Sequence, residues 1–232
     1  MKNKIYIFGA SGFLGKVLST NLKDFKDLIK VGRNDDGIYF DLENSKPQDL
    51  KGRINFGDIW VFLAAVTSPE ECENKPNFTF NINVTKTNNL IEWLTNEGVK
   101  VIFASSDTVF SKKKGIAYDD DSLEPLGEYA RQKSLVEKFV SHNRLVKVVR
   151  FSYILGHEDK FSCLVKMFEK AKTKLDIYSD FKRCVVLLDD VELGIKNLIK
   201  NWDSFDFKSV NFCGPELVNR AEIANVLKSK FY

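Results

Sequence analysis

The sequence predicts an α/β protein built on a doubly wound parallel sheet, with a small lobe toward its C-terminal end. Three observations predict this class. Short apolar runs alternate with helical patterns, the runs are apolar at consecutive positions, and the first run leads into a glycine-rich turn. Strands that are apolar on both faces are typical of a sheet covered by helices on both sides.

Strands and helices alternate through the first two thirds of the chain. We expect strands at 4–10, 28–33, 38–42, 58–65, 99–106 and 146–152, and helices at 11–22, 77–94 and 128–142. This order predicts parallel strands joined by right-handed helical crossovers.

The first strand enters the first helix through Gly9, Gly12 and Gly15. Gly9 permits a tight turn, Gly12 lets a pyrophosphate approach the backbone, and Gly15 lets the helix pack closely on the strand. Free N–H groups at the helix start favour anions. The spacing also fits an ordinary turn, but its place between strand and helix favours a dinucleotide-binding Rossmann fold.

The second strand ends at Arg33, where an acid that binds the ribose of NAD is usual. A guanidinium suits a 2′-phosphate, so we expect NADP (NADPH) rather than NAD. Asp35 and Asp36 are placed to reach the ribose hydroxyls, and Arg33 also fits a surface residue. Asp41 fits either a hydrogen bond from adenine or a cap of the following turn.

Tyr129 and Lys133 share one face of the expected helix 128–142. A lysine ammonium near a phenol is expected to lower the phenol's pKa, so that Tyr129 exchanges a proton with a carbonyl or carbinol oxygen. A YxxxK pattern also arises by chance, as at Tyr178 and Lys182, which we discard because that stretch is strand-like.

Ser105, Ser106 and Asp107 end the strand before that helix, at the carboxyl edge where ligands bind in such sheets. Each serine alone fits a turn residue. A glycine turn, a serine-bearing strand and a YxxxK helix in this order predict a Ser106–Tyr129–Lys133 catalytic set.

Beyond residue 150 the regular alternation of strand and helix patterns ends. We expect helices at 161–172, 190–202 and 219–231, and strands at 175–178, 183–188 and 209–213. The predicted domains are a dinucleotide-binding Rossmann domain with the catalytic set over 1–150, and a reduced substrate-binding lobe over 151–232, interleaved with the end of the sheet. No Pro/Gly/Ser-rich linker separates them, so we expect the lobe to pack on the main domain.

Composition excludes several other classes. With 44% hydrophobic and 29% charged residues in 232, a packed core is expected. The net charge is +3, the basic residues are scattered along the chain, and Lys112–Lys114 fit a solvated loop. We therefore expect no nucleic-acid partner. The four cysteines lack zinc or disulfide spacing, so no metal is expected. Without a signal peptide or a membrane-length apolar run, we expect no membrane partner and a cytoplasmic location.

The chain resembles the extended short-chain dehydrogenase/reductases, within them the dTDP-4-dehydrorhamnose reductase-like and sugar-nucleotide epimerase groups. The matching stretches are IFGASGFLG, DIWVFLAAVTSPEECENKP, FNINVTKTNNLIEW, VIFASSDTVF, EYARQKSLVEKFV, VVRFSYILG, KRCVVLLDDVELGI and NFCGPELVNRAEIANVL. The resemblance places the catalytic residues on Ser106, Tyr129 and Lys133. It implies that Asn83 orders the strand beneath its helix, and that Arg183 grips a diphosphate, although a surface ion pair fits it equally.

The predicted sites follow from motif and resemblance together. The expected cofactor-binding residues are Gly9, Ser11, Gly12, Phe13, Leu14, Gly15, Arg33, Asp41, Leu42, Leu63, Ala64, Ala65, Asn83, Ser105, Lys133 and Phe151. The expected substrate-binding residues are Thr67, Ser106, Asp107, Thr108, Tyr129 and Arg183.

The resemblance implies NADPH-dependent reduction of a keto group on a nucleotide-linked deoxysugar, in surface-polysaccharide precursor synthesis. One alternative is an epimerase or dehydratase with tightly bound NAD, for which Glu70, Glu71, Cys72 and His157 are weak acid/base candidates. Another is a non-catalytic NADP-binding regulator. Relatives continue past the end of this chain, so we expect an open pocket or one completed by a partner subunit. A homodimer through 77–94 and 128–140 is expected.

Overall fold

The computed structural model describes residues 3–22, 25, 27–33, 36–113, 115–156, 158–177, 179–180 and 182–231. A seven-stranded sheet has the order β3-β2-β1-β4-β5-β6-β9, and all its neighbours pair in parallel. Its strands are β1 (Ile5–Phe8), β2 (Leu28–Gly32), β3 (Ile38–Tyr39), β4 (Ile59–Phe62), β5 (Lys100–Ser106), β6 (Val146–Phe151) and β9 (Ser209–Phe212). The predicted doubly wound fold is confirmed.

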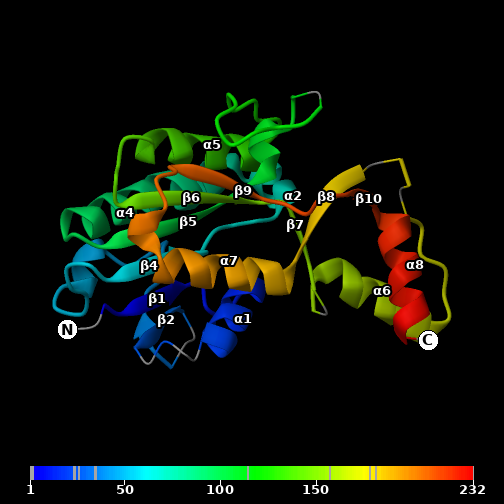
Figure 1. Ribbon diagram of the computed structural model, residues 1–232, viewed down its shortest axis with the longest axis horizontal. Coiled ribbons are helices and arrows are strands. Elements are labelled where there is room, and N and C mark those ends of the chain that lie inside the picture. Colours follow the sequence, from blue (N-terminus) through cyan, green and yellow to red (C-terminus); the bar gives the residue numbers. More distant parts are fainter. Residues whose placement is uncertain are drawn as a thin grey trace.

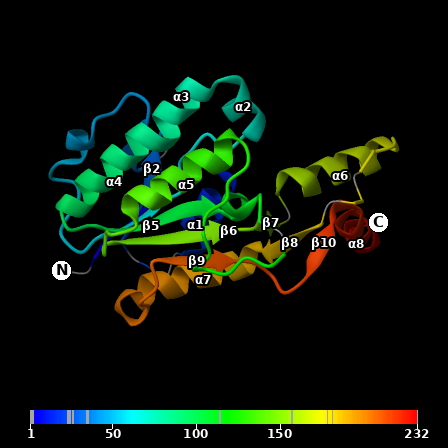
Figure 2. The same cartoon turned by 90° about the horizontal axis from the view of Figure 1, so that it is seen from above.

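Helices cover both faces of this sheet (Figure 2). One face carries α1 (Phe13–Asn21) and α7 (Leu188–Lys200). The other carries α4 (Thr87–Asn96) and α5 (Glu128–Val140). Side chains alternate between the faces along each strand, so Tyr6 and Trp60 stack at 5.0 Å on the α4–α5 side, whereas Ile7 packs on the α1–α7 side.

A lobe extends from one end of the sheet, beyond the carboxyl ends of its strands (Figure 1). It contains β7 (Tyr153–Leu155), β8 (Lys182–Leu187), β10 (Leu217–Asn219), α6 (Lys160–Ala171) and α8 (Arg220–Phe231). Strand β8 pairs in parallel with β7 and antiparallel with β10. Phe161, Val165, Ile223 and Ala224 form a separate small core.

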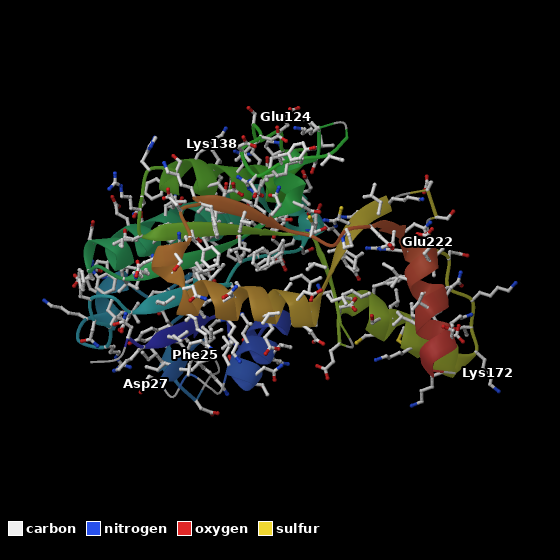
Figure 3. The ribbon with its side chains drawn as sticks, in the orientation of Figure 1. Phe25, Asp27, Glu124, Lys138, Lys172 and Glu222 are labelled. Atoms are coloured by element: carbon white, nitrogen blue, oxygen red, sulfur yellow. The ribbon has the colours of Figure 1, made fainter. Side chains whose placement is uncertain are left out.

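The lobe is interleaved with the large sheet. The chain leaves the sheet after Phe151, returns to it in α7 and β9, and leaves again for β10 and α8. The domain division at residue 150 stays a prediction. Polar side chains cap the N-terminal starts of α6 and α8. Asp159 accepts the backbone N–H groups of Phe161 and Ser162 at the start of α6. Glu222, in the first turn of α8 (Figure 3), accepts the backbone N–H of Asn219.

Several expected elements differ in the structure. Residues 175–177, expected in a strand, have neither strand nor helix; Leu175 and Ile177 pack against the lobe core instead. The expected helix 77–94 is three pieces, namely α3 (Pro76–Phe80), a π-helix (Asn81–Lys86) and α4. Elements without a sequence expectation are β7, β10, α2 (Pro69–Asn74) and the 3₁₀ turns Pro47–Leu50, Asp107–Phe110 and Trp202–Ser204.

Candidate active site

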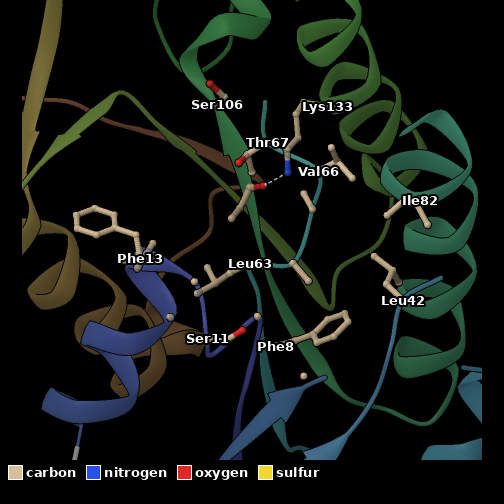
Figure 4. A pocket seen from close by; sticks show the side chains of 18 of the residues that line it. Phe8, Ser11, Phe13, Leu42, Leu63, Val66, Thr67, Ile82, Ser106 and Lys133 are labelled. Carbon is tan, nitrogen blue, oxygen red and sulfur yellow. Dashed lines mark hydrogen bonds between the residues drawn. The ribbon is translucent and has the colours of Figure 1, made fainter. Parts of the chain in front are cut away.

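A pocket of about 580 Å³ lies at the carboxyl ends of the central strands, beside the point between β1 and β4 where the strand order reverses. Figure 4 shows Phe13 on one side of it and Leu42 and Ile82 on the other. The predicted residues that line it are Gly9, Ser11, Gly12, Phe13, Leu14, Gly15, Arg33, Asp41, Leu42, Leu63, Ala64, Ala65, Thr67, Ser105, Ser106, Tyr129, Lys133 and Phe151. The predicted residues outside the lining are Asn83, Asp107, Thr108 and Arg183.

The glycine turn leaves no room for side chains. Gly9 has φ +92°, and a Cβ there would lie 2.9 Å from the backbone nitrogen of Ala64. A Cβ on Gly15 would lie 2.1 Å from the carbonyl oxygen of Gly9. Gly12 is the N-cap of α1 without a side-chain cap, so the helix start presents backbone N–H groups to the pocket. This cradle fits the diphosphate of a dinucleotide.

Charged residues were expected at the adenosine end, near the end of β2 and after β3. Arg33 is exposed and lines the pocket. Asp36 has a 98% exposed side chain 3.9 Å from Lys30 and does not line it, and Asp35 lies outside the described residues. Both carboxylate oxygens of Asp41 accept bonds inside the next turn, from the Glu43 N–H at 3.2 Å and the Asn44 amide at 2.7 Å. Asp41 therefore caps that turn while lining the pocket.

Asn83 stands behind the pocket wall rather than in it. Its side chain is buried in the π-helix, accepts the Val66 N–H at 2.8 Å and donates to the Val66 carbonyl at 2.9 Å. It also donates to Gln132 of α5 at 2.8 Å. Since Val66 lines the pocket, Asn83 shapes the wall through the backbone after β4.

Ser106, Tyr129 and Lys133 all line the pocket, and Figure 4 shows Ser106 and Lys133 on the side away from Ser11 of the glycine turn. Lys133 crosses from α5 to β5, where its ammonium donates to the carbonyl oxygen of Ala104 at 2.7 Å (Figure 4). That ammonium lies 5.9 Å from the centre of the Tyr129 ring. The Ser106 hydroxyl donates to Asp107 at 3.3 Å and accepts from the Thr108 hydroxyl at 3.0 Å.

Burial dominates the electrostatics of this end. It lowers the pKa of Lys133 to about 8, against the opposing influence of Glu137. It also raises the pKa of Tyr129 above its ordinary value, helped by Cys72 and Asp107 and opposed by Arg183. The expected lowering of the Tyr129 pKa is therefore wrong, because burial is the largest influence on that pKa and raises it. A neutral phenol is the proton-donating form.

Asp107 connects Ser106 to the lobe. Its carboxylate accepts from Arg183 of β8 at 2.5 Å and from Ser152 at 3.1 Å. The Ser152 hydroxyl also donates to the carbonyl oxygen of Cys184 at 2.5 Å. Arg183 does not line the pocket itself. It forms an ion pair with Asp107, the neighbour of Ser106, and its side chain is about one-third exposed.

Sequence reasoning missed Phe8, Gly32, Phe40, Glu43, Val66, Phe78, Ile82, Ala104, Ser152 and Ile154, which also line the pocket. Phe8, Gly32 and Ala104 stand at or beside the carboxyl ends of strands, and that position was a usable signal. Phe78 and Ile82 come from a helical segment whose rotation depends on the π-helix, for which no local signal exists.

The weaker acid/base candidates are not in the lining. Glu70, Glu71 and Cys72 belong to α2, and Cys72 is fully buried. His157 and Tyr178 lie outside the described residues. Across the residues that the structure describes, no group of three or more His, Cys, Asp and Glu could hold a metal ion. No helix in that part of the chain is long and apolar enough to cross a membrane.

The doubly wound sheet with serine, tyrosine and lysine at its carboxyl edge defines an extended short-chain dehydrogenase/reductase. Within that class the chain belongs to the family described as RmlD substrate binding domain, which matches residues 2–227. The resemblance stated from the motifs is confirmed.

Individual relatives agree with this family. The chain is 26% identical over 201 residues to dTDP-4-dehydrorhamnose reductase of Sinorhizobium fredii, covering 85% of this chain and 66% of that protein. It is 30% identical over 179 residues to methionine adenosyltransferase 2 subunit beta of Bos taurus, covering 73% of this chain and 53% of that protein. The chain thus spans less than two thirds of the length of these two curated relatives.

A solved structure supports the fold. The structure of dTDP-4-dehydrorhamnose reductase from Bacillus anthracis str. Ames in complex with NADP matches with a TM-score of 0.87 at 22% identity. The match covers 99% of this chain and 81% of that one.

Proposed function

We propose that this chain reduces a keto group on a nucleotide-linked deoxysugar with NADPH, in the synthesis of surface-polysaccharide precursors. One observation carries the proposal: the glycine turn and the Ser106–Tyr129–Lys133 set line the same pocket. The relative named dTDP-4-dehydrorhamnose reductase supports the substrate class.

The cofactor fits the residues present. Side chains at Gly9 and Gly15 would collide with neighbouring backbone, and Gly12 leaves the start of α1 without a side-chain cap, so the N–H groups of the turn are open to a diphosphate. With the cofactor's diphosphate held there, its nicotinamide would supply a hydride to the keto carbon. Arg33 is placed for the adenosine end, and it supports NADP over NAD because a guanidinium neutralises a 2′-phosphate.

The chain's own residues handle the proton. Tyr129, kept neutral by burial, donates its phenolic proton to the substrate's keto oxygen as negative charge develops there. Ser106 turns its hydroxyl from Asp107 to the same oxygen. The Lys133 ammonium stabilises the phenolate that Tyr129 becomes. Arg183 exchanges Asp107 for the substrate's diphosphate.

The proposal is tested by mixing the purified protein with NADPH and a panel of dTDP-, GDP- and UDP-linked keto sugars, and following NADPH absorbance. Tyr129→Phe should lower kcat by about 100-fold or more while NADPH still binds, since the phenol donates a proton but does not hold the diphosphate. Turnover without added cofactor would instead support an epimerase or dehydratase with tightly bound NAD.

A second candidate is a non-catalytic NADP-binding regulator. The likeness to proteins named as a beta subunit of methionine adenosyltransferase favours it. Tyr129→Phe separates the two, because a regulator would keep its biological activity without the phenol. Titration with NADPH and NADH, on the wild type and on Arg33→Ala, tests the cofactor choice. Arg33→Ala should weaken NADPH binding and leave NADH binding unchanged.

We propose a homodimer through the segments 77–94 and 128–140, where Phe139 is 48% exposed and the Arg131 guanidinium lies 5.5 Å from the centre of the Phe80 ring. Light scattering of the wild type and of Phe139→Lys tests it. A cytoplasmic location is proposed from the nature of the substrate, and fractionation of cells tests it.

A further inference from the structure

A buried ion pair lies directly behind the catalytic residues. Glu137 of α5 and Arg150 of β6 are 4% and 5% exposed at their side chains. One carboxylate oxygen of Glu137 accepts from two nitrogens of Arg150, at 2.8 and 2.9 Å. Neither residue lines the pocket. A buried ion pair contributes little net stability by itself, because desolvation of both charges offsets their attraction.

The other oxygen of Glu137 accepts from the Ser105 hydroxyl. One helical turn earlier on α5, the Lys133 ammonium donates to the carbonyl oxygen of Ala104. Two consecutive residues of β5, immediately before Ser106, are therefore held by two side chains of the catalytic helix. This grip determines how the strand that carries Ser106 sits against the helix that carries Tyr129.

Arg150 is itself held on its far side. Its guanidinium donates to the carbonyl oxygen of Asp119 at 2.9 Å and to the Asn211 side chain of β9 at 3.4 Å. The Asp119 carboxylate accepts the Asn211 N–H at 2.6 Å. Arg150 is thus anchored to the loop before α5 and to the last strand of the sheet, and Glu137 cannot turn away from Lys133 without leaving a buried charge unpaired.

We propose that Glu137, held in place by Arg150, is a positioning residue that supplies the buried negative charge keeping Lys133 protonated and ties the end of β5 to the catalytic helix. The role deepens the proposed reductase function and rests on it, because it assigns Lys133 the work of stabilising the Tyr129 phenolate.

The charged surroundings of Lys133 favour Glu137 for this role. Titratable or charged groups around the Tyr129–Lys133 pair are Glu137 on α5, Cys72 on α2, Asp107 after β5, Arg183 on β8 and Arg150 on β6. Burial pulls the pKa of Lys133 down to about 8, and Glu137 is the largest opposing influence. Cys72 has a raised pKa and stays a neutral thiol, so Glu137 is the charge that counts.

The test is the pKa of Lys133, followed by NMR of isotope-labelled lysine side chains and assigned with Lys133→Arg. Glu137→Gln keeps the shape of the side chain and removes its charge. We expect it to lower the Lys133 pKa by about one unit, as expected for loss of an opposite charge nearby. The matched control is Glu128→Gln, on the same helix with its carboxylate paired to Arg131, which should leave that pKa in place.

Glu137→Gln leaves Arg150 buried without a full partner, so the double variant Glu137→Gln/Arg150→Met removes both charges and guards against misfolding. Its Lys133 pKa should also fall. An unchanged Lys133 pKa in both folded variants would overturn the inference. In the reductase assay, the alkaline limb of kcat should move to lower pH in Glu137→Gln, while KM changes less.

The NMR measurement needs no substrate, so the two proposals fail separately. If the Lys133 pKa falls in Glu137→Gln but the wild type reduces no keto sugar, the effect of Glu137 on Lys133 stands and the reductase function is wrong. Turnover by the wild type with an unmoved Lys133 pKa would do the reverse.

Discussion

At the residue scale, burial of Lys133 works against folding stability while serving the site. Its pKa in the folded chain is about 8, below the ordinary value of 10.5. Between those two values the unfolded chain binds a proton that the folded chain does not, so stability rises with pH through this window. Below it, the cost of keeping the buried ammonium is fully present.

We therefore expect Lys133→Met to raise the free energy of unfolding at about pH 7 by about 1–3 kcal/mol, with a gain that shrinks as pH rises from about 8 toward 10. Urea denaturation across that range measures it. Lys138→Met is the matched control, because Lys138 is exposed on the same helix and points away from the sheet (Figure 3). A gain independent of pH would contradict the argument.

Gly15 is a second residue of the pocket, and the surrounding backbone leaves no room for a side chain there. A Cβ there would lie 2.1 Å from the Gly9 carbonyl oxygen and 2.8 Å from the Ala10 Cα, so α1 must move away from β1. We expect Gly15→Ala to cost about 1–3 kcal/mol and to weaken NADPH binding by tenfold or more. Fluorescence titration and thermal melts check both. Lys16→Ala, at an exposed position on the same helix, should do neither.

At the element scale, the π-helix Asn81–Lys86 explains how one side chain shapes the pocket wall. It turns Asn83 toward both backbone groups of Val66 and toward Gln132. Asn83→Ala would leave these buried groups unpaired. The expected loss is about 2 kcal/mol of unfolding free energy, together with weaker NADPH binding through the displaced Val66.

Asn81→Ala is the matched control, since Asn81 is exposed in the same π-helix. Chemical denaturation and NADPH titration of both variants give the comparison. Equal losses in the two would show that the helix as a whole, rather than the Asn83 side chain, supports the wall.

The elements of the large sheet were predictable because their signals are local. Continuous apolar strands such as 58–65, the glycine turn at Gly9 and the YxxxK helix each carry their own pattern. The π-helix was not predictable, because the apolar residues of 77–94 keep the spacing of an ordinary helix. The wider turn accompanies the buried hydrogen bonds of Asn83 to Val66, which no local pattern reveals. Residues 175–177 have the sequence pattern of a strand but do not pair with another strand. Instead, Leu175 and Ile177 pack against the lobe core.

The pocket lining was predictable where a motif marks it. Ser106 ends strand β5, and Tyr129 and Lys133 share one face of helix α5 through the YxxxK pattern. Val66 was missed because its position depends on Asn83, which lies 17 residues further along the chain. The direction of the Tyr129 pKa was also missed, because burial is a property of the assembled pocket.

At the scale of the whole molecule, the chain has two large cores on either face of the sheet and a third, smaller core in the lobe. The lobe is joined to the sheet by polar contacts, among them Arg183 with Asp107 and Ser152 with the Cys184 carbonyl, and by Ile154 and Val186, which pack in the core on the α1–α7 side. Among the described residues, helices α6 and α8 pack only on the small lobe core. Local opening costs less free energy where little apolar surface is buried. The lobe should therefore open more readily than the sheet.

Hydrogen exchange followed by mass spectrometry should show this difference. We expect amides of α6 and α8 to exchange faster than those of β1, β4 and β5, which lie between the two large cores. A nucleotide-linked sugar bound through Arg183 would join lobe and sheet, so it should slow exchange in α6 and α8, while NADPH alone should protect the glycine turn. Arg183→Ala should abolish the lobe's response to the sugar nucleotide and keep the response of the turn to NADPH. A lobe as protected as the central strands before any ligand is added would show that the molecule opens only as one unit.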